Sequence, residues 1–355
     1  MKINDLVRLR IENQRLNKTK FGDPGEVVNW FCAMQAQDYL GALWSVGQRL
    51  EKSTETEIEK AIADRRIVRT WPMRGTLHFV SPVDVRWMLR LLTPRIIVKT
   101  KSLYQQQGLD SKIFTKSKKI IERTLAKHGQ LTRAELYKAL MKEKIAVNEQ
   151  RGIHIIGHAA QEGLICLGPR SGKQHTFVLL DEWIPKSKNI TTDESLAELG
   201  SRYLDSHGPA TIQDFSWWSG LTLAEVKRSL DMIQEKWVSF RIDDQDYFMK
   251  PPNAVSKRRG PQVSLLSWFD EYIIGYKDRS AAFDPETEKF IEKPKNGIYT
   301  PVILIDGKIA GNWKRSFEKQ HVKIEVEPFR KFNEQEKKAI DQALQEYRSF
   351  LSMPA

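Results

Sequence analysis

Apolar and polar positions along the chain form a block that repeats, and residues 129–181 show it most clearly. The 3.6-residue spacing of apolar positions predicts two consecutive helices, and Thr132 and Glu135 are placed as a capping box at the start of the first. Two strand-like runs joined by a basic, glycine-containing turn follow. The expected elements are helices over 133–142 and 150–162, strands over 164–167 and 176–180, and a turn over 168–173. Two helices followed by a hairpin with a basic tip is the order of a winged helix.

The same order is predicted nearer the N-terminus. The expected elements are helices over 25–34, 39–48 and 54–64, then strands over 67–69 and 76–80 that turn at 71–75. The two hairpins also share a short similar sequence, residues 72–80 in the first and 169–178 in the second. Because the similarity falls at the same place in both units, it indicates a repeat.

A third copy is predicted over residues 208–250. Thr211 begins a helix that runs through Trp218, and a second helix over 222–234 starts with a capping box of Thr222 and Glu225. The hairpin strands, 237–242 and 247–250, turn at residues 243–246, where three of the four residues are aspartate. An acidic hairpin turn repels phosphate, so we expect this copy to have a structural role and not to bind nucleic acid.

The rest of the chain predicts an α+β fold: tandem winged-helix repeats followed by a C-terminal antiparallel β unit closed by a helix. The predicted domains are 1–128, a winged-helix unit with a basic helical extension that includes a helix over 83–92; 129–195 and 196–255, two further winged-helix units; and 262–355, the β-rich domain. The linker before the last domain is marked by Pro251-Pro252 and the basic Lys257, Arg258 and Arg259. The expected strands beyond it are 263–268, 273–276, 301–305, 308–313 and 322–326, with a tight turn at Asp306-Gly307 and a final helix over 333–351.

Charge separates this chain from an average globular protein. The sequence has 57 Lys and Arg against 45 Asp and Glu, a formal net charge of +12. Residues 81–128 hold eleven of the basic residues and only three acidic ones, so most of the surplus lies in this stretch. A clustered basic surface favours a polyanionic partner, because cations that neutralise phosphates release condensed counterions.

Several classes of protein are disfavoured. The two cysteines, Cys32 and Cys166, lie in apolar runs, which is typical of core residues in a reducing compartment. The sequence lacks a transmembrane-length apolar stretch and a signal-peptide pattern, so a cytoplasmic location is expected. It also lacks nucleotide-binding loops and paired zinc motifs, so no cofactor or metal is expected. His154 and His158 lie four residues apart on a predicted helix, but a polar stripe facing DNA or solvent is favoured over a metal site because no third ligand is evident.

The hairpin tips are candidates for nucleic-acid contacts. Arg69, Arg74, Arg170 and Lys173 lie where a wing meets backbone phosphates. Trp71 and Met73 are candidates to pack against bases of the nucleic acid. An alternative, equally compatible with the sequence, is that Trp71 packs beneath its own hairpin. These predictions concern the loop tips and not the helices.

A polar string between two apolar helices, residues 33–39, is the candidate catalytic motif. In a regular helix Gln35 and Gln37 point about 200° apart and share no target. If they act together, the backbone there must be non-helical, so that residues i and i+2 project to one side. Without further context, two glutamines at a helix junction are more often capping or solvated residues.

Four strings, residues 33–38, 69–78, 216–221 and 269–279, resemble the AlkZ/YcaQ family of winged-helix DNA glycosylases. The resemblance extends over essentially the whole chain. Members carry a catalytic Gln-apolar-Gln or Gln-apolar-Asp motif, and Gln35-Ala36-Gln37 matches the first form. A carboxylate occurs only one position later, at Asp38; Asp38 and Asp270 are both candidates to assist as a base.

The resemblance implies a monofunctional glycosylase that removes cationic purines alkylated at N7 from double-stranded DNA, and that in some members unhooks interstrand crosslinks. It implies Gln35 and Gln37 as the residues that position the attacking water. The residues expected to contact DNA are Arg69, Trp71, Met73, Arg74, His78, Arg95, His154, Arg170, Lys173, Lys277 and Arg279.

A monomer is expected, because three non-identical copies in one chain can bind DNA asymmetrically without a partner subunit. The alternative is a non-catalytic winged-helix protein such as a transcription regulator, which usually dimerises on palindromes; RNA binding is a weaker one.

Overall fold

Two compact units make up the chain in the computed structural model. Met1–Ile58 together with Leu196–Ala355 form one, which we call the terminal unit, and Glu59–Ser195 form the other, the central unit. The structure describes residues 2–17, 20–251, 260–284, 286–290, 300–317 and 321–352. The predicted linker residues Lys257, Arg258 and Arg259 lie outside the described residues.

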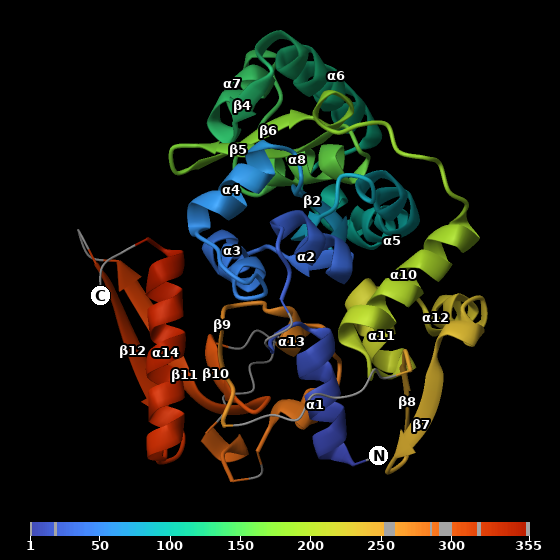
Figure 1. Cartoon of the computed structure of the whole chain (residues 1–355). Helices are drawn as coiled ribbons and strands as arrows, with labels where there is room; N and C mark the ends of the chain where they lie inside the picture. The colour runs from blue at the N-terminus through green and yellow to red at the C-terminus, as the bar shows by residue number, and fades with distance from the viewer. Residues whose placement is uncertain are drawn as a thin grey trace. The chain divides into compact units, whose positions relative to one another are not determined.

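An antiparallel sheet runs through the central unit, with strands in the order β3-β2-β5-β6-β4 (Figure 1). The elements of this unit are β2 (Val68–Met73), β3 (Thr76–Val80), α5 (Val85–Gln106), α6 (Ser111–His128), β4 (Gln130–Thr132), α7 (Arg133–Lys142), α8 (Arg151–Gln161), β5 (Ile165–Ser171), β6 (Gln174–Leu179) and α9 (Leu180–Trp183). The sequence indicates two separate hairpins, but β2 pairs with β5 through Arg69 and Leu167. The two hairpins therefore belong to one sheet.

Local signals in the central unit are confirmed where the residues themselves make the interaction. Helix α7 occupies its predicted span, and its capping box is present: the Thr132 backbone N–H donates to Glu135 at 2.7 Å, and the Glu135 N–H donates to the Thr132 hydroxyl. Gly172, in the turn between β5 and β6, has a φ of 60°, a conformation that glycine adopts without strain.

Helix α5 is longer than predicted. The sequence predicts a helix over 83–92, whereas α5 extends to Gln106 and passes through Pro94. Proline removes one backbone donor and usually ends or kinks a helix. Buried residues lie on both sides of it, Trp87 and Leu92 before and Ile96 after, so tertiary packing maintains the helix across the proline.

The terminal unit combines helices from both ends of the chain with a separate sheet. Its elements are α1 (Ile3–Asn13), α2 (Pro24–Phe31), β1 (Ala33–Gln35), α3 (Tyr39–Gly47), α10 (Thr192–His207), α11 (Ile212–Ser219), α12 (Leu223–Asp231), β7 (Val238–Ile242), β8 (Gln245–Met249), β9 (Val263–Leu266), α13 (Glu271–Ile274), β10 (Val302–Ile305), β11 (Lys308–Phe317), β12 (Val322–Pro328) and α14 (Glu334–Phe350). Short 3-10 turns cover Gln234–Lys236, Ser280–Ala282 and Glu288–Phe290, and α4 (Glu55–Ala63) lies at the boundary of the two units. Among the described helices, none has the length and apolar character of a membrane span.

The C-terminal strands form an antiparallel sheet in the order β12-β11-β10-β9, beside which α14 lies (Figure 1). The predicted tight turn is confirmed, with Ile305 opposite Lys308 and positive φ angles at Asp306 and Gly307. Tyr347 of α14 packs edge-to-face against Trp313 of β11. This aromatic contact joins the helix to the sheet.

The third predicted helix–helix–hairpin segment is present as α11, α12, β7 and β8. Thr211 and Thr222 both cap the helices that follow them. Just before α11, Ala210 bridges to Phe248 of β8, as β4 pairs with β6 in the central unit. The two segments thus share the same order of elements and the same pairing before the first helix.

Two predictions in the terminal unit were wrong. Residues 273–276 do not form a strand, because the Asp270 side chain accepts the Tyr272 backbone N–H at 3.0 Å and so caps the short helix α13. The first helix of the apolar pair ends at Phe31 instead of residue 34, because Cys32 adopts a φ of 64° and the chain continues as β1.

A buried ion pair lies at the centre of the terminal unit. Arg49 and Asp270 are both fully buried, and two guanidinium nitrogens of Arg49 each contact one Asp270 oxygen at 2.9 Å. The Ser45 hydroxyl donates to the same carboxylate at 2.6 Å. Burial alone would raise the pKa of Asp270, but the Arg49 charge and these hydrogen bonds outweigh it and hold the pKa below its usual range.

We expect the Arg49→Met variant to lose about 3–5 kcal/mol of unfolding free energy at pH 7, because it leaves a buried carboxylate without its counter-charge. Urea unfolding measures this. Since the folded-state pKa of Asp270 is lowered, the wild-type pair stabilises the fold above about pH 4 and the stabilisation is lost as pH falls further. The double variant Arg49→Met/Asp270→Asn should recover part of the loss, and equal losses in the single and double variants would contradict this explanation.

Candidate active site and DNA interface

The Gln35-Ala36-Gln37 motif lies on a non-helical segment of the terminal unit. Helix α2 ends at Phe31, β1 covers Ala33–Gln35, and α3 begins after Asp38. The condition stated for joint action of the two glutamines, a backbone that is not helical, is therefore met. The segment is short, so both of its ends are held by the helices that flank it.

The two glutamines differ in exposure. Gln35 is 9% exposed, whereas Gln37 is exposed and borders a pocket of about 590 Å³. The residues that line this pocket come from the end of the glutamine motif and from the C-terminal sheet and the segments next to it. They are Gln37, Asp38, Ser267, Trp268, Phe269, Thr300, Pro301, Trp313, Lys314 and Arg315. Its volume is within the range of small-molecule sites. The convergence of the two amides on one target stays a prediction.

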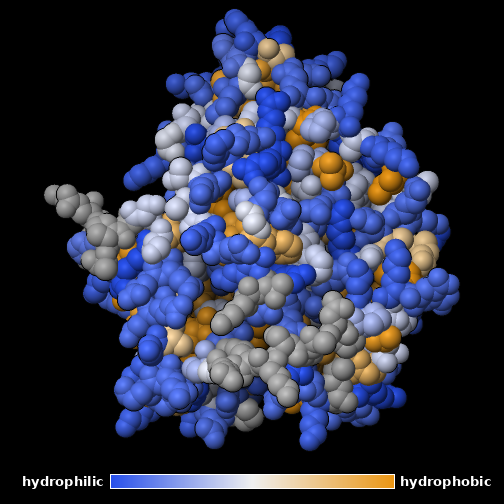
Figure 2. Space-filling model, viewed as in Figure 1, coloured by the Kyte–Doolittle hydropathy of each residue, from blue (hydrophilic) through white to orange (hydrophobic). Residues whose placement is uncertain are grey.

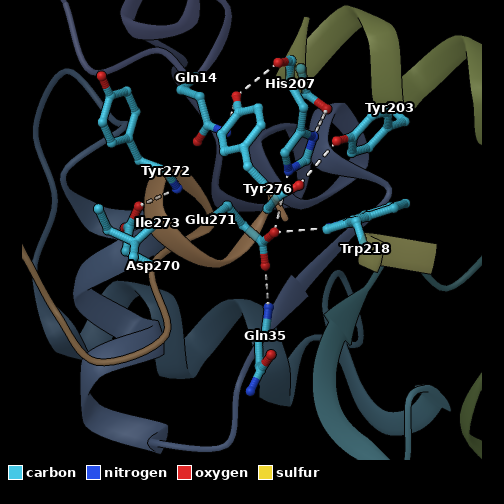
Figure 3. Close-up of polar contacts among 12 residues, drawn as sticks. Gln14, Gln35, Tyr203, His207, Trp218, Asp270, Glu271, Tyr272, Ile273 and Tyr276 are labelled. Carbon is cyan, nitrogen blue, oxygen red and sulfur yellow. Dashed lines mark hydrogen bonds and ion pairs between the residues drawn. The ribbon is translucent and has the colours of Figure 1, made fainter. Parts of the chain in front are cut away.

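The backbone of Gln35 is held by a buried carboxylate. The Gln35 N–H donates to Glu271 Oε1 at 2.7 Å, while its side chain extends away from Glu271 (Figure 3). The other oxygen, Oε2, accepts the Trp218 indole N–H at 2.9 Å and lies 3.2 Å from His207 Nε2. Glu271 is 1% exposed, so these donors replace its hydration. One carboxylate thus connects β1, α10, α11 and α13.

His207 is held in turn by its surroundings. Tyr203 stacks on its ring with centroids 4.7 Å apart, and the Tyr276 hydroxyl donates to its backbone carbonyl at 2.7 Å (Figure 3). Burial lowers the pKa of His207, and although Glu271 acts in the opposite direction, the net shift is downward. At neutral pH the ring is therefore uncharged, with Nε2–H as the donor to the carboxylate.

Sequence reasoning missed Glu271, His207 and Trp218 as residues of the site. Glu271 and Trp218 belong to strings that carry the family resemblance, but nothing local connects either of them to Gln35. Glu271 is 236 positions from Gln35 and 53 from Trp218, so only the folded chain brings them together.

The two candidate bases have different environments. Asp270 is fully buried and paired with Arg49, which excludes it from contact with DNA or water in this structure. Asp38 is half-buried and lines the same pocket as Gln37. Of the two, only Asp38 remains a candidate.

The first hairpin does not expose its predicted DNA contacts. Trp71 and Met73 are 9% and 0% exposed, and Trp71 belongs to the apolar core of the central unit. The alternative in which Trp71 packs beneath its hairpin therefore describes the structure. His78 is also fully buried, with its ring near the Thr76 carbonyl oxygen. Direct base contact requires exposed surface, and in this conformation Trp71, Met73 and His78 do not have it.

Arg69 is likewise 3% exposed, because it lies where β2 pairs with β5. Its guanidinium is 3.2 Å from the His175 ring of β6. Burial, followed by the positive charges of Arg69 and Arg170, lowers the pKa of His175 to about 4, so the ring is neutral beside the cation. Arg69 therefore supports the sheet from inside and does not lie at a tip.

The remaining tip cations are more accessible. Arg74 is half-buried with a φ of 55° in the β2–β3 turn, and Lys173 is exposed in the β5–β6 turn. Arg170 is half-buried and forms an ion pair with Glu59, which neutralises its charge. Phosphate contact by Arg74 and Lys173 stays a prediction. The predicted phosphate contact by Arg170 requires that its ion pair with Glu59 break.

Helix α8 carries His154 and His158, and neither forms a stripe open to DNA. His158 is 8% exposed and stacks on Phe114 of α6, with ring centroids 3.9 Å apart. Gln161, at the end of the same helix, is 7% exposed, and His154 is half-buried. The described residues contain no cluster of three His, Cys, Asp or Glu side chains able to hold a metal.

Three further predicted contacts are at least partly exposed. Lys277 is exposed, and its backbone N–H donates to Asp214 at 2.9 Å. Arg279 is half-buried and lies over the Trp217 ring. Arg95 of α5 is half-buried, with one guanidinium nitrogen on the Leu91 carbonyl. Their roles in DNA binding stay predictions.

Comparison with known proteins bears directly on this site. The family model described as "DNA glycosylase AlkZ-like" matches residues 28–350. An "Interstrand DNA cross-link repair glycosylase" of Streptomyces sahachiroi is 24% identical over 328 residues, which are 86% of this chain and 85% of the relative. The solved structure of Streptomyces sahachiroi DNA glycosylase AlkZ superposes with a TM-score of 0.80 at 22% identity, covering 99% of this chain and 97% of that one. The family match includes the Gln35–Gln37 motif and Glu271, and the chain belongs to the AlkZ-like family of DNA glycosylases.

Proposed function

We propose that the protein is a monofunctional glycosylase that hydrolyses the N-glycosidic bond of cationic N7-alkylated purines in duplex DNA. The observation that carries this proposal is the Gln35-Ala36-Gln37 motif on a non-helical segment, with its backbone held by the buried Glu271. The name of the Streptomyces sahachiroi relative supports extending the proposal to interstrand crosslinks, which the enzyme would unhook by the same reaction.

The chemistry of the lesion explains why amides suffice. An N7-alkylated purine is positively charged, so it leaves without a proton from an acid. The protein has mainly to hold a water near C1′ and to accommodate an oxocarbenium-like sugar. Amide oxygens accept hydrogen bonds from that water and orient it, which is where much of the rate gain arises. Gln37 borders a pocket that also contains the half-buried carboxylate of Asp38, which suits a cationic base.

We further propose that the helix–helix–hairpin segments are winged-helix units, with the domain bounds 1–128, 129–195, 196–255 and 262–355. The capping boxes and the matching pairings of β4 with β6 and of Ala210 with Phe248 support this interpretation. The third unit is proposed to have a structural role and not to bind DNA, because its hairpin turn carries Asp243 and Asp244, which repel phosphate. We propose that the protein acts on double-stranded DNA as a monomer.

The Gln35→Ala/Gln37→Ala variant should release N7-methylguanine from a duplex about 100-fold more slowly, or slower still, since it removes the groups that orient the water. Single-turnover base release at saturating enzyme measures this rate. The matched control is Gln342→Ala/Gln345→Ala, which removes two exposed amides from α14 and should leave the rate unchanged. Undiminished release by the first variant would rule out the mechanism. If the wild type binds a specific undamaged sequence and releases no base, the regulator alternative holds instead.

The Glu271→Gln variant tests whether this carboxylate positions the motif. The amide NH₂ group of the new glutamine cannot accept a hydrogen bond, so at least one of the three N–H donors around residue 271 loses its acceptor. We expect single-turnover base release to fall 10- to 100-fold while the Kd for the duplex stays within about twofold. Glu336→Gln is the control, because Glu336 is also a buried carboxylate but caps α14 and pairs with Arg330. Both variants should lower the Tm. A rate equally unaffected in both would show that Glu271 is only a stability element.

A further inference from the structure

The helix expected to read DNA in the central unit is covered. In winged-helix proteins the second helix of the pair, here α8, enters the major groove. Every residue of α8 is buried or half-buried. The Thr93 hydroxyl of α5 donates to the Gln161 carbonyl at 2.9 Å, and Phe114 of α6 stacks on His158. Helix α8 therefore packs inside the unit and has no exposed face to lay in a groove.

Helix α6 of the same unit carries a row of exposed positive charge. Five cations on this helix are all exposed: Lys112, Lys116, Lys119, Arg123 and Lys127. Their spacing of four, three, four and four residues places them within about 80° of arc at 100° per residue. We call these five residues the basic stripe. The surface over α6 and α7 is predominantly hydrophilic (Figure 2).

Acidic residues neutralise little of the basic stripe. Arg123, whose side chain is 71% exposed, pairs at 2.9 Å with Glu143, which directly follows α7, and Lys116 donates to the Glu143 backbone carbonyl. Among the described residues, no acidic side chain pairs with Lys112, Lys119 or Lys127. An amphipathic helix needs only polar residues on its outer face, so five like charges in one narrow row exceed what folding requires.

The length of the row matches a nucleic-acid strand. From Lys112 to Lys127 the helix rises about 22 Å, at 1.5 Å per residue. About six phosphates of one DNA strand lie along that length of duplex. A shallow depression of about 400 Å³ borders Lys112, Lys116 and Lys119, which gives room beside the stripe. A straight row of like charges complements a phosphate backbone.

We propose that the central unit holds duplex DNA by helix α6, through contacts of the basic stripe with backbone phosphates, and not by insertion of α8 into a groove. The contacts are with backbone phosphates and so are independent of sequence. This inference rests on the proposed function only in requiring that the protein act on duplex DNA. It gives a role to five of the eleven basic residues of 81–128.

The test compares two triple variants with the same loss of charge. Lys112→Ala/Lys119→Ala/Lys127→Ala removes the unpaired part of the stripe, and Lys52→Ala/Lys331→Ala/Lys338→Ala removes three exposed lysines elsewhere. All six positions are exposed, so both proteins should keep the wild-type Tm. The Kd for an undamaged 30-base-pair duplex is measured by fluorescence anisotropy at several KCl concentrations.

Loss of three phosphate contacts should lower the slope of log Kd against log [KCl] by about 2.7, and weaken binding about tenfold or more near 0.1 M salt. The control variant should keep the wild-type slope. Equal slopes in the two variants would overturn the proposal, and would leave an acidic protein as the partner of the stripe. Failure of the wild type to release N7-methylguanine would refute the proposed lesion class without changing this slope difference, so the two failures are distinguishable.

Discussion

The Glu271 carboxylate is out of reach of water and depends on three N–H donors, the backbone of Gln35, the indole of Trp218 and the imidazole of His207. Removing a charged group from water costs several kcal/mol unless such donors replace its hydration. The donors come from segments far apart in the sequence, so the carboxylate is satisfied only when these segments are correctly assembled. The segment that carries Gln35 and Gln37 is therefore coupled to the fold of the terminal unit. Asp270, the residue before Glu271, caps α13 and forms the buried ion pair with Arg49.

The two helix–helix–hairpin segments that lie wholly within one unit present different surfaces despite a shared order of elements. Helix α8 is packed inside the central unit, whereas α12 of the terminal unit leaves Leu223 and Lys227 exposed. The hairpin tips differ as well, with Lys173 in one and Asp243 in the other. A shared order of elements thus does not give the same exposed surface, because neighbouring elements decide which face of each segment remains exposed.

Interactions within a few residues were the part that could be predicted from sequence. The capping box of Thr132 and Glu135 and the turn at Asp306-Gly307 involve residues that contact each other directly. The continuation of α5 past Pro94 and the burial of Met73 depend on packing against distant residues, which the local pattern does not contain. For the same reason the motif Gln35-Ala36-Gln37 was found from resemblance, but the carboxylate that holds it was not.

Amide hydrogen exchange at Gln35, followed by NMR or by mass spectrometry with fragmentation to single residues, tests most directly whether Glu271 holds the segment that carries Gln35 and Gln37. The Gln35 N–H should exchange slowly in the native protein, at a rate close to those of the core amides of α11, and should exchange much faster in the Glu271→Gln variant. If this amide exchanges in the native protein as fast as those of the exposed β7–β8 turn, the carboxylate does not hold the segment and the account is wrong.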